Sequence, residues 1–207
     1  MTSAMDIAAP DLLSSGAHAL RATAGAVLGQ PGGVFGARGE FFGGFLTIDE
    51  NASVPSVALL RPGTAHRAVV QVGPDRPGLR PRKLCIKIPD AYGPGKDQDF
   101  LLASSGDGAP LHHVVMPAEP VASLYSSLWL YLAGLQPVLF GVRPSTTGPD
   151  LRFGSGDEVS FLISAPVGQF RRIGSLRLTG PLDGPPVRFS GGNSGGSIRP
   201  LPPVTFY

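Results

Sequence analysis

A serine, a histidine and an aspartate are the residues whose types and order could support covalent catalysis. Ser194 lies in the glycine-rich stretch 192–196, where backbone N–H groups could stabilise a developing oxyanion. His66 and Asp99 precede it, so the base, the acid and the nucleophile occur in the order His, Asp, Ser. These three residues predict acyl-transfer chemistry if the fold brings them together.

The stretch Gly192-Asn193-Ser194-Gly195-Gly196 resembles the nucleophile turn of trypsin-like serine proteases. In that family, further strands after the serine close the second barrel and build the specificity pocket. Here the sequence reaches Tyr207 soon after Ser194, and the pair Pro202-Pro203 takes up part of that stretch. A flexible Gly/Ser loop is therefore the main interpretation of this stretch, and a trypsin-like protease is the remote alternative.

Cys85 is the one cysteine of the chain, and it lies between Lys83 and Lys87 in a strand-like pattern. Two neighbouring ammonium groups would favour the thiolate if this side chain were exposed. In a barrel, Cys85 could instead be a small wall residue of an interior cavity. The adjacent pair His112-His113 would face opposite sides of an extended strand, so we expect no shared metal there.

Composition limits the class of protein. The 207 residues are 42% hydrophobic and 15% charged, with 29 Gly and 22 Pro, which is typical of short strands joined by many turns. A net charge of +2 without a basic stripe argues against a nucleic-acid partner. We find no run of about 18 apolar residues and no secretory signal, and a single cysteine suits a reducing compartment. The expected location is cytoplasmic, without a membrane span.

Hydrophobic spacing predicts mostly strands. One helix is expected at 11–29, before the Gly/Pro-rich stop at 29–33, and a second at 121–135, where apolar residues recur at helical spacing. The expected domains are an N-terminal helical segment, 1–33, and a barrel domain, 34–207. Eight strands are predicted, at 41–48, 67–72, 84–88, 100–103, 138–142, 158–164, 173–179 and 187–190.

Four segments, in the right order, resemble the catalase-like family. The strongest match is 82–88 followed by 97–102, which is similar to that family's RG-x-A-x-K and QDF-x-L hairpin. Residues 35–45 resemble the strand that carries the distal histidine. Residues 125–129 resemble a Y-x-S segment, and 187–189 with 198–201 resemble the L-x-F-N-P and RPLG stretches. The resemblance implies an α+β fold, with an antiparallel β-barrel of about eight strands and peripheral helices.

The family's haem site can be followed residue by residue. Gly36 occupies the slot of the distal histidine, and Gln71 that of a propionate-binding arginine. Ser104 or Ser105 falls near the slot of the distal asparagine. Arg82 matches an arginine of the haem-binding pattern. Tyr207 is a poor proximal ligand, because Pro203 stands four positions before it, where the family has an arginine.

The resemblance therefore implies a catalase-like barrel whose haem site is degenerate. We expect it to lack true catalase activity and to act as a binding or structural subunit, in a homo-oligomer or a larger complex. The alternative is a haem-dependent peroxidase or hydroperoxide-processing enzyme, in which haem is the cofactor.

Overall fold

The computed structural model describes residues 39–73, 82–116, 124–145, 153–185 and 187–201. Within these ranges the regular elements are ten strands and two short 3₁₀ helices. The 3₁₀ helices are η1 (Ala58–Leu60) and η2 (Leu111–His113). The strands are β1 (Glu40–Ile48), β2 (Ala65–Val72), β3 (Lys83–Ile88), β4 (Gln98–Ser105), β5 (Leu124–Ser126), β6 (Tyr131–Ala133), β7 (Gln136–Pro144), β8 (Glu158–Ser164), β9 (Arg171–Pro181) and β10 (Ile198–Pro200).

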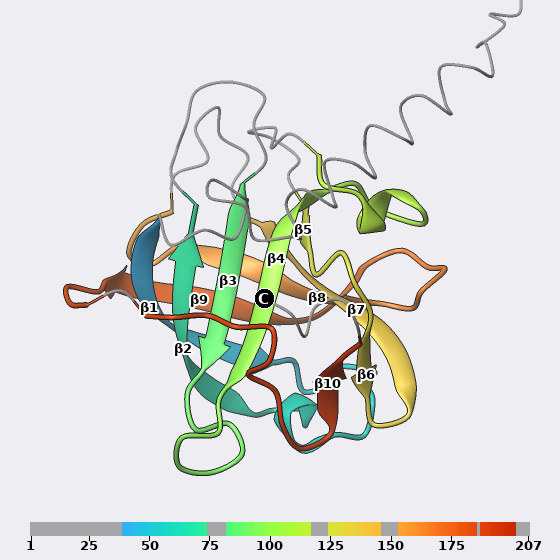
Figure 1. Cartoon of the computed structure of the whole chain (residues 1–207), viewed down its shortest axis with the longest axis horizontal. Coiled ribbons are helices and arrows are strands. Elements are labelled where there is room, and N and C mark those ends of the chain that lie inside the picture. The colour runs from blue at the N-terminus through green and yellow to red at the C-terminus, as the bar shows by residue number, and fades with distance from the viewer. Residues whose placement is uncertain (1–38, 74–81, 117–123, 146–152, 186, 202–207) are drawn as a thin grey trace, which may run out of the picture.

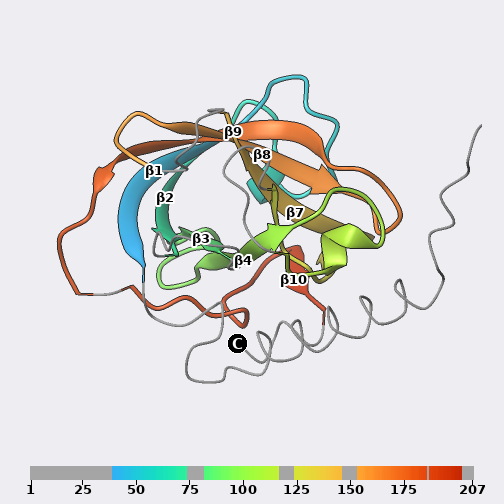
Figure 2. The ribbon, with the colours of Figure 1, turned by 90° about the horizontal axis from the view of Figure 1, so that it is seen from above.

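Eight of these strands close into an antiparallel barrel (Figures 1 and 2). Their order is β7-β5-β4-β3-β2-β1-β9-β8, and the pairing of β7 with β8 closes the ring. Strands β6 and β10 extend the sheet from β7 outside this ring. Closure removes the unpaired edges that an open sheet of this size would expose. The predicted antiparallel barrel of about eight strands is confirmed.

The interior of the barrel is filled by side chains from alternate positions of the strands. Leu84, Ile86 and Ile88 of β3 point inward, and three aromatic rings pack around Phe100. The ring centroid of Phe100 lies 4.8 Å from that of Phe140 and 5.8 Å from that of Phe161. Each fully buried large apolar side chain contributes roughly 1.5–3 kcal/mol to folding, so this core is the main source of stability.

Gly174 marks the tightest approach between two strands. A Cβ atom there would collide with the backbone oxygen of Thr47 on the neighbouring strand β1. We expect Gly174→Ala to lower the free energy of unfolding by about 1–3 kcal/mol, because neither backbone can move away inside a closed barrel. Gly180→Ala on the same strand is the control, since its nearest contact would be the Ser155 hydroxyl at 3.9 Å. Equal denaturant midpoints for the two variants would contradict this account of the packing.

The predicted helix at 121–135 is wrong where the structure describes it. The segment folds as β5, a tight turn and β6 instead. Ser126 Oγ accepts a hydrogen bond from Leu128 N, and Ser127 Oγ donates to the Trp129 oxygen. Such serine bonds to nearby backbone groups compete with helix formation, and Leu128 adopts a φ of +58° in the turn.

Most of the predicted strands are confirmed, whereas one strand and the peripheral helices are not found in the described residues. Seven of the eight predicted strands coincide with observed strands, but 187–190 forms no strand. The expected peripheral helices are not found in the described ranges, where the helical elements are η1 and η2 alone. The predicted helix at 11–29 and the division at residue 33 lie outside the described residues. In the described part of the chain, no helix has the length and apolar character needed to cross a membrane.

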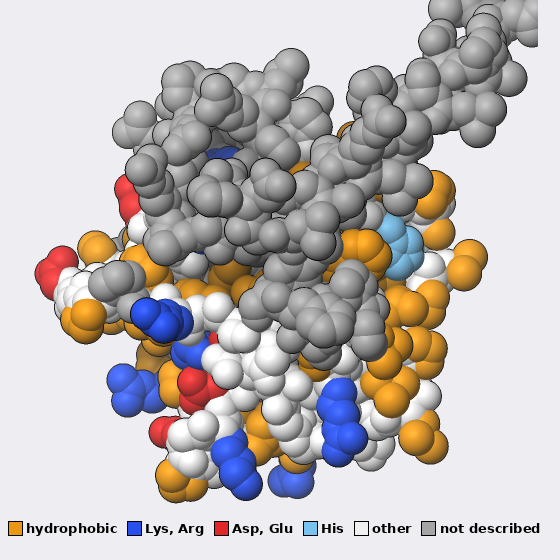
Figure 3. Space-filling model, viewed as in Figure 1, with side chains coloured by type: hydrophobic (Ala, Val, Ile, Leu, Met, Phe, Trp, Pro, Cys, Tyr) orange, Lys and Arg blue, Asp and Glu red, His pale blue; other side chains and the backbone are white. Residues whose placement is uncertain are grey.

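Three of the five large hydrophobic side chains that are exposed in the described residues lie on one side of the barrel. Leu111 of η2, Leu135 between β6 and β7, and Val167 between β8 and β9 are exposed by 48%, 92% and 88%. Figure 3 shows hydrophobic side chains gathered along this edge of the molecule.

Candidate functional site on the outer wall of the barrel

Charged side chains are buried on the outer face of β3 and β4. Lys87 is 5% exposed and Asp99 is fully buried, although both point away from the barrel interior. They are covered by residues 187–196, which we call the strap. The strap follows β9 in the chain and runs across the outside of β2, β3 and β4 before it reaches β10 (Figures 1 and 2). The site is therefore built from a barrel wall and the segment that lies on it.

Lys87 and Asp99 form the centre of this site. They stand directly opposite each other in the β3–β4 register, which places their side chains on the same face of the sheet. Lys87 Nζ lies 2.8 Å from Asp99 Oδ1, and it donates to Asp99 Oδ2 at 3.0 Å and to Asp97 Oδ2 at 3.1 Å. A buried ammonium group between two carboxylates has its charge balanced locally.

The strap supplies further hydrogen bonds to the Asp99 carboxylate. Ser190 N donates to Asp99 Oδ2 at 2.8 Å, and Asn193 Nδ2 donates to the same oxygen at 2.9 Å. In return, the backbone N–H of Asp99 donates to the Asn193 oxygen at 2.9 Å. One carboxylate thus joins the barrel wall to the strap through charge-assisted hydrogen bonds.

Burial and hydrogen bonding act in opposite directions on these carboxyl groups. Burial raises the pKa of Asp99, and the bonds from Lys87, Ser190 and Asn193 offset only part of that rise. Burial also acts to raise the pKa of Asp97, but the backbone N–H of Asp90 and the Lys87 ammonium lower it overall. The ionised form is therefore more favoured at Asp97 than at Asp99, where it depends on the hydrogen bonds from Lys87, Ser190 and Asn193.

Aromatic contacts hold the strap at its two ends. The ring of Phe189 stacks on Phe41 of β1, with centroids 6.4 Å apart, and Lys87 Nζ lies 5.6 Å from the Phe189 centroid. At the other end, the ring of Tyr92 lies against Gly195 and Gly196, where any Cβ atom would collide with it. Gly196 also has a φ of +52°, which favours glycine.

The glycine-rich stretch 192–196 is thus part of the strap, and the geometry does not support the remote alternative of a trypsin-like protease. His66 Nε2 is hydrogen-bonded to the Leu59 oxygen at 2.9 Å, near η1 and on the inward-facing side of β2. Asp99 lies on the outward face and is engaged by Lys87. Ser194 sits beside Asp99 through Asn193, but the histidine is on the other side of the wall. The three residues do not form a catalytic triad.

The described residues that match haem-site slots lie together at one end of β2, β3 and β4. Gln71 is opposite Cys85 in the β2–β3 register and is buried on the outer wall. The Ser104 hydroxyl donates to the Met116 oxygen at 2.5 Å and accepts from Arg82 N at 3.0 Å. Gly36 and Tyr207 lie outside the described residues, so their assignments remain predictions.

Cys85 faces out of the barrel and not into an interior cavity. It is 1% exposed, with Gln71 and Leu101 as its cross-strand neighbours. Burial raises the pKa of the Cys85 thiol to about 12, and the nearby Lys83 opposes this only in part. Burial also lowers the pKa of Lys83. The thiolate that flanking lysines would favour at the surface is therefore disfavoured here.

The two adjacent histidines lie in η2 and not in an extended strand. Their ring centroids are 4.3 Å apart, with the rings at 81° to each other. His112 Nε2 is bonded to the Pro166 oxygen at 3.2 Å, and His113 Nδ1 to the Leu128 oxygen at 2.7 Å. Among the residues that the structure describes, no three His, Cys, Asp or Glu side chains are grouped to hold a metal ion.

The Lys87–Asp99 pair was not anticipated, although the sequence contains a signal for it. The β3–β4 turn runs through Gly93, and Lys87 and Asp99 lie at equal distances from that residue along the chain. A hairpin centred on Gly93 therefore places the two residues opposite each other. The contribution of Asn193 has no comparable local signal, because it comes from a segment 94 residues away.

An eight-stranded antiparallel barrel with this strand order defines a class of fold, and a search of solved structures identifies that class. The chain is similar to a fungal catalase, with a TM-score of 0.58 and 12% sequence identity, over 100% of this chain and 61% of the catalase chain. The chain thus has a catalase-like fold and spans about three fifths of that catalase's length. No protein-family model matches the sequence, and no curated protein matches it.

Proposed function

We propose that this chain is a catalase-like barrel that acts as a binding or structural subunit and does not turn over peroxide. The observation that carries the proposal is the buried Lys87–Asp99 pair with the strap fastened on it. In this arrangement the outer face of β3 and β4 binds a peptide segment. We infer the binding or structural role from this polar, segment-holding wall, and the similarity to catalase concerns the fold alone.

The described residues do not fit a haem group. A propionate-binding slot needs a cation, whereas Gln71 carries a neutral amide. A distal polar group must be able to turn toward a peroxide, whereas the Ser104 hydroxyl is engaged between Arg82 N and the Met116 oxygen. Arg82 is the described residue that agrees with the haem pattern. Outside the described ranges, the sequence has Gly36 where the family has a histidine.

The alternative is a haem-dependent peroxidase, and the catalase-like fold together with Arg82 favours it. In that case the chain would have to bind haem with ligands other than those of the family pattern. The two candidates differ in colour, because protein-bound haem absorbs strongly near the violet end of the visible spectrum.

Light scattering of the purified chain, together with its absorption spectrum, tests the proposal. We expect a stable association, with itself or with a co-purifying protein, and no Soret band. A monomer that carries a stoichiometric Soret band would contradict the proposal and establish the peroxidase alternative.

A further inference from the structure

The short helix η2 is fastened to two turns of the barrel by its histidines. His112 Nε2 lies 3.2 Å from the Pro166 oxygen, in the turn between β8 and β9. His113 Nδ1 lies 2.7 Å from the Leu128 oxygen, in the turn between β5 and β6. Because a carbonyl oxygen only accepts, each ring donates through the nitrogen named here. The Ser126 hydroxyl of β5 adds a third bond, to the His112 oxygen at 2.6 Å.

The ring of His112 is buried in its neutral form. The side chain is fully buried, although an imidazole in water titrates near pH 6.5. Its ring packs edge-on against those of Phe170 and His113, with centroids 6.0 Å and 4.3 Å away. Nε2 carries the proton donated to Pro166, and Nδ1 is buried without a hydrogen-bond partner in the described residues. A second proton would therefore place an N–H group and a positive charge at a buried position without an acceptor.

The charges around His112 leave such a proton uncompensated. The turns 127–130 and 165–170 contain no acidic and no basic residue. Asp107 attracts a charged ring from the connection between β4 and η2, but its carboxylate already forms an ion pair with Arg143 of β7, at 2.7 Å. A charged ring thus gains little from its described surroundings.

The hold of η2 on the barrel should depend on pH for this reason. Burial lowers the pKa of His112, His113 lowers it further, and the backbone of Pro166 and Gly168 together with Asp107 opposes this only in part. The closed state therefore binds fewer protons than an open state in which the ring has its ordinary pKa of about 6.5. The hold is complete above that pH and is lost as the pH falls below it.

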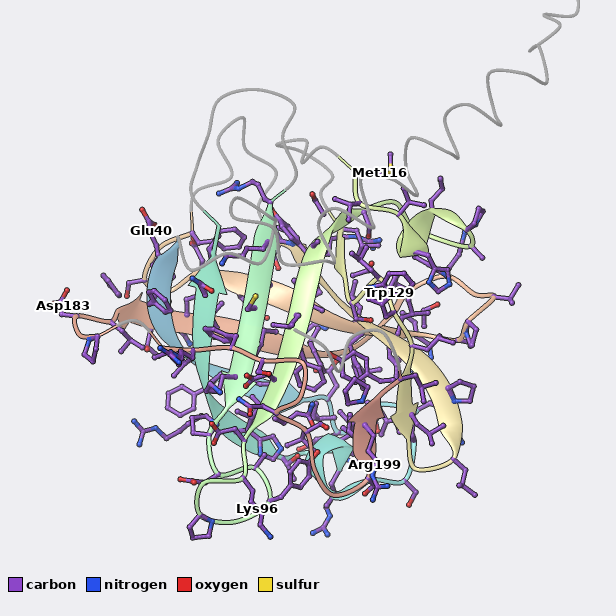
Figure 4. The ribbon with its side chains drawn as sticks, in the orientation of Figure 1. Glu40, Lys96, Met116, Trp129, Asp183 and Arg199 are labelled. Atoms are coloured by element: carbon purple, nitrogen blue, oxygen red, sulfur yellow. The ribbon has the colours of Figure 1, made fainter. Side chains whose placement is uncertain are left out.

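We propose that η2 is an acid-sensitive latch, in which protonation of His112 expels the ring and releases η2 from the β8–β9 turn. Phe170, whose ring lies against His112, would then become exposed beside Leu111 and Val167, which are exposed already. Figure 4 shows η2 on the side of the barrel that carries the labelled Trp129. The latch does not involve the strap or a haem group, so it goes beyond the function proposed above.

Hydrogen–deuterium exchange of the full chain at pH 7.5 and pH 5.5, corrected for the intrinsic pH dependence of exchange, tests the latch. We expect the protection of peptides covering 106–116 and 164–170 to fall about tenfold at pH 5.5, because opening takes up one proton below about pH 6.5. Peptides of β3 should keep their protection, since the barrel wall takes no part. Unchanged protection of both segments at pH 5.5 would overturn the inference.

His112→Gln removes the titrating group and keeps a side-chain N–H for the Pro166 oxygen. We therefore expect the fall in protection between the two pH values to disappear in this variant. His66→Gln is the matched control, because His66 also donates to a backbone oxygen, that of Leu59 at 2.9 Å, but lies on β2. It should retain the tenfold fall. Persistence of the fall in His112→Gln, or its equal loss in both variants, would contradict the latch.

Nitrogen NMR of the parent chain labelled at its histidines decides the question if His112→Gln fails to fold. We expect the His112 ring to be neutral at pH 5.5 in the closed protein, with its proton on Nε2. A His112 ring that is charged at pH 5.5 while η2 keeps its protection would overturn the inference, because protonation would then not release the segment.

Discussion

Replacing Lys87 by methionine is expected to lower the free energy of unfolding by about 3–5 kcal/mol at neutral pH, because it leaves the fully buried Asp99 carboxylate without its cation. Methionine is unbranched and only one atom shorter than lysine, so the loss is mainly electrostatic and only in small part a cavity effect. Urea denaturation followed by circular dichroism measures it.

The loss should also depend on pH. Asp99 has a raised pKa in the folded protein, so the folded state binds more protons than the unfolded state above the ordinary aspartate pKa. Stability from this group therefore falls as pH rises through that window, and removal of Lys87 should enlarge the effect. We expect Lys87→Met to lie closer to the parent at pH 4 than at pH 7.

Two further variants define the control for this prediction. Arg172→Met removes an exposed ion pair with Asp49 and should cost less than about 1 kcal/mol. Lys87→Met combined with Asp99→Leu should recover only part of the loss, because it removes the uncompensated buried charge but leaves Ser190 N and Asn193 Nδ2 without their acceptor. If Lys87→Met lowered the free energy of unfolding no more than Arg172→Met, the buried Lys87–Asp99 pair would not stabilise the fold as we describe.

The second large effect is expected in the reactivity of Cys85. With a pKa of about 12 in place of 9.0, the thiolate fraction at pH 8 falls by about a thousandfold. Labelling by iodoacetamide should therefore be roughly 30-fold slower in the folded chain than in the chain unfolded by urea, because the higher nucleophilicity of a thiolate with a raised pKa offsets part of the smaller thiolate fraction. It should be slower still because the sulfur is buried. Mass spectrometry of timed samples gives both rates. Rapid labelling of the folded chain would show that the outer wall is open.

Local pattern was sufficient to predict most of the barrel. Alternation in segments such as 41–48 and 84–88 reports which side of a strand meets the core, and a closed barrel needs little more than a set of such strands. The helix at 121–135 was wrong because two short strands and a turn place Tyr125, Leu128 and Tyr131 in the interior. Those burials imitate helical spacing, and the serine bonds that set the turn are not visible in a hydrophobic pattern.

The candidate site was harder to predict than the fold, because it depends on contacts between distant parts of the chain. Asp99 was singled out for a role beside a histidine, yet its partners are Lys87 across the hairpin and Asn193 from the strap. The glycines at 195–196 are explained by the ring of Tyr92. Nothing in the sequence around residue 193 indicates that it will lie on β4.

Titration of hemin into the purified chain, with oxygen evolution from hydrogen peroxide measured in the same samples, tests the central claim most directly. We expect no sharp stoichiometric Soret shift and no oxygen beyond that released by free hemin, because the described wall lacks the donors that a haem site needs and general acid–base help of about 10²–10⁴ in rate is missing. A Tyr207→Phe variant should behave like the parent. A stoichiometric Soret shift with oxygen evolution, and its loss in that variant, would contradict the account.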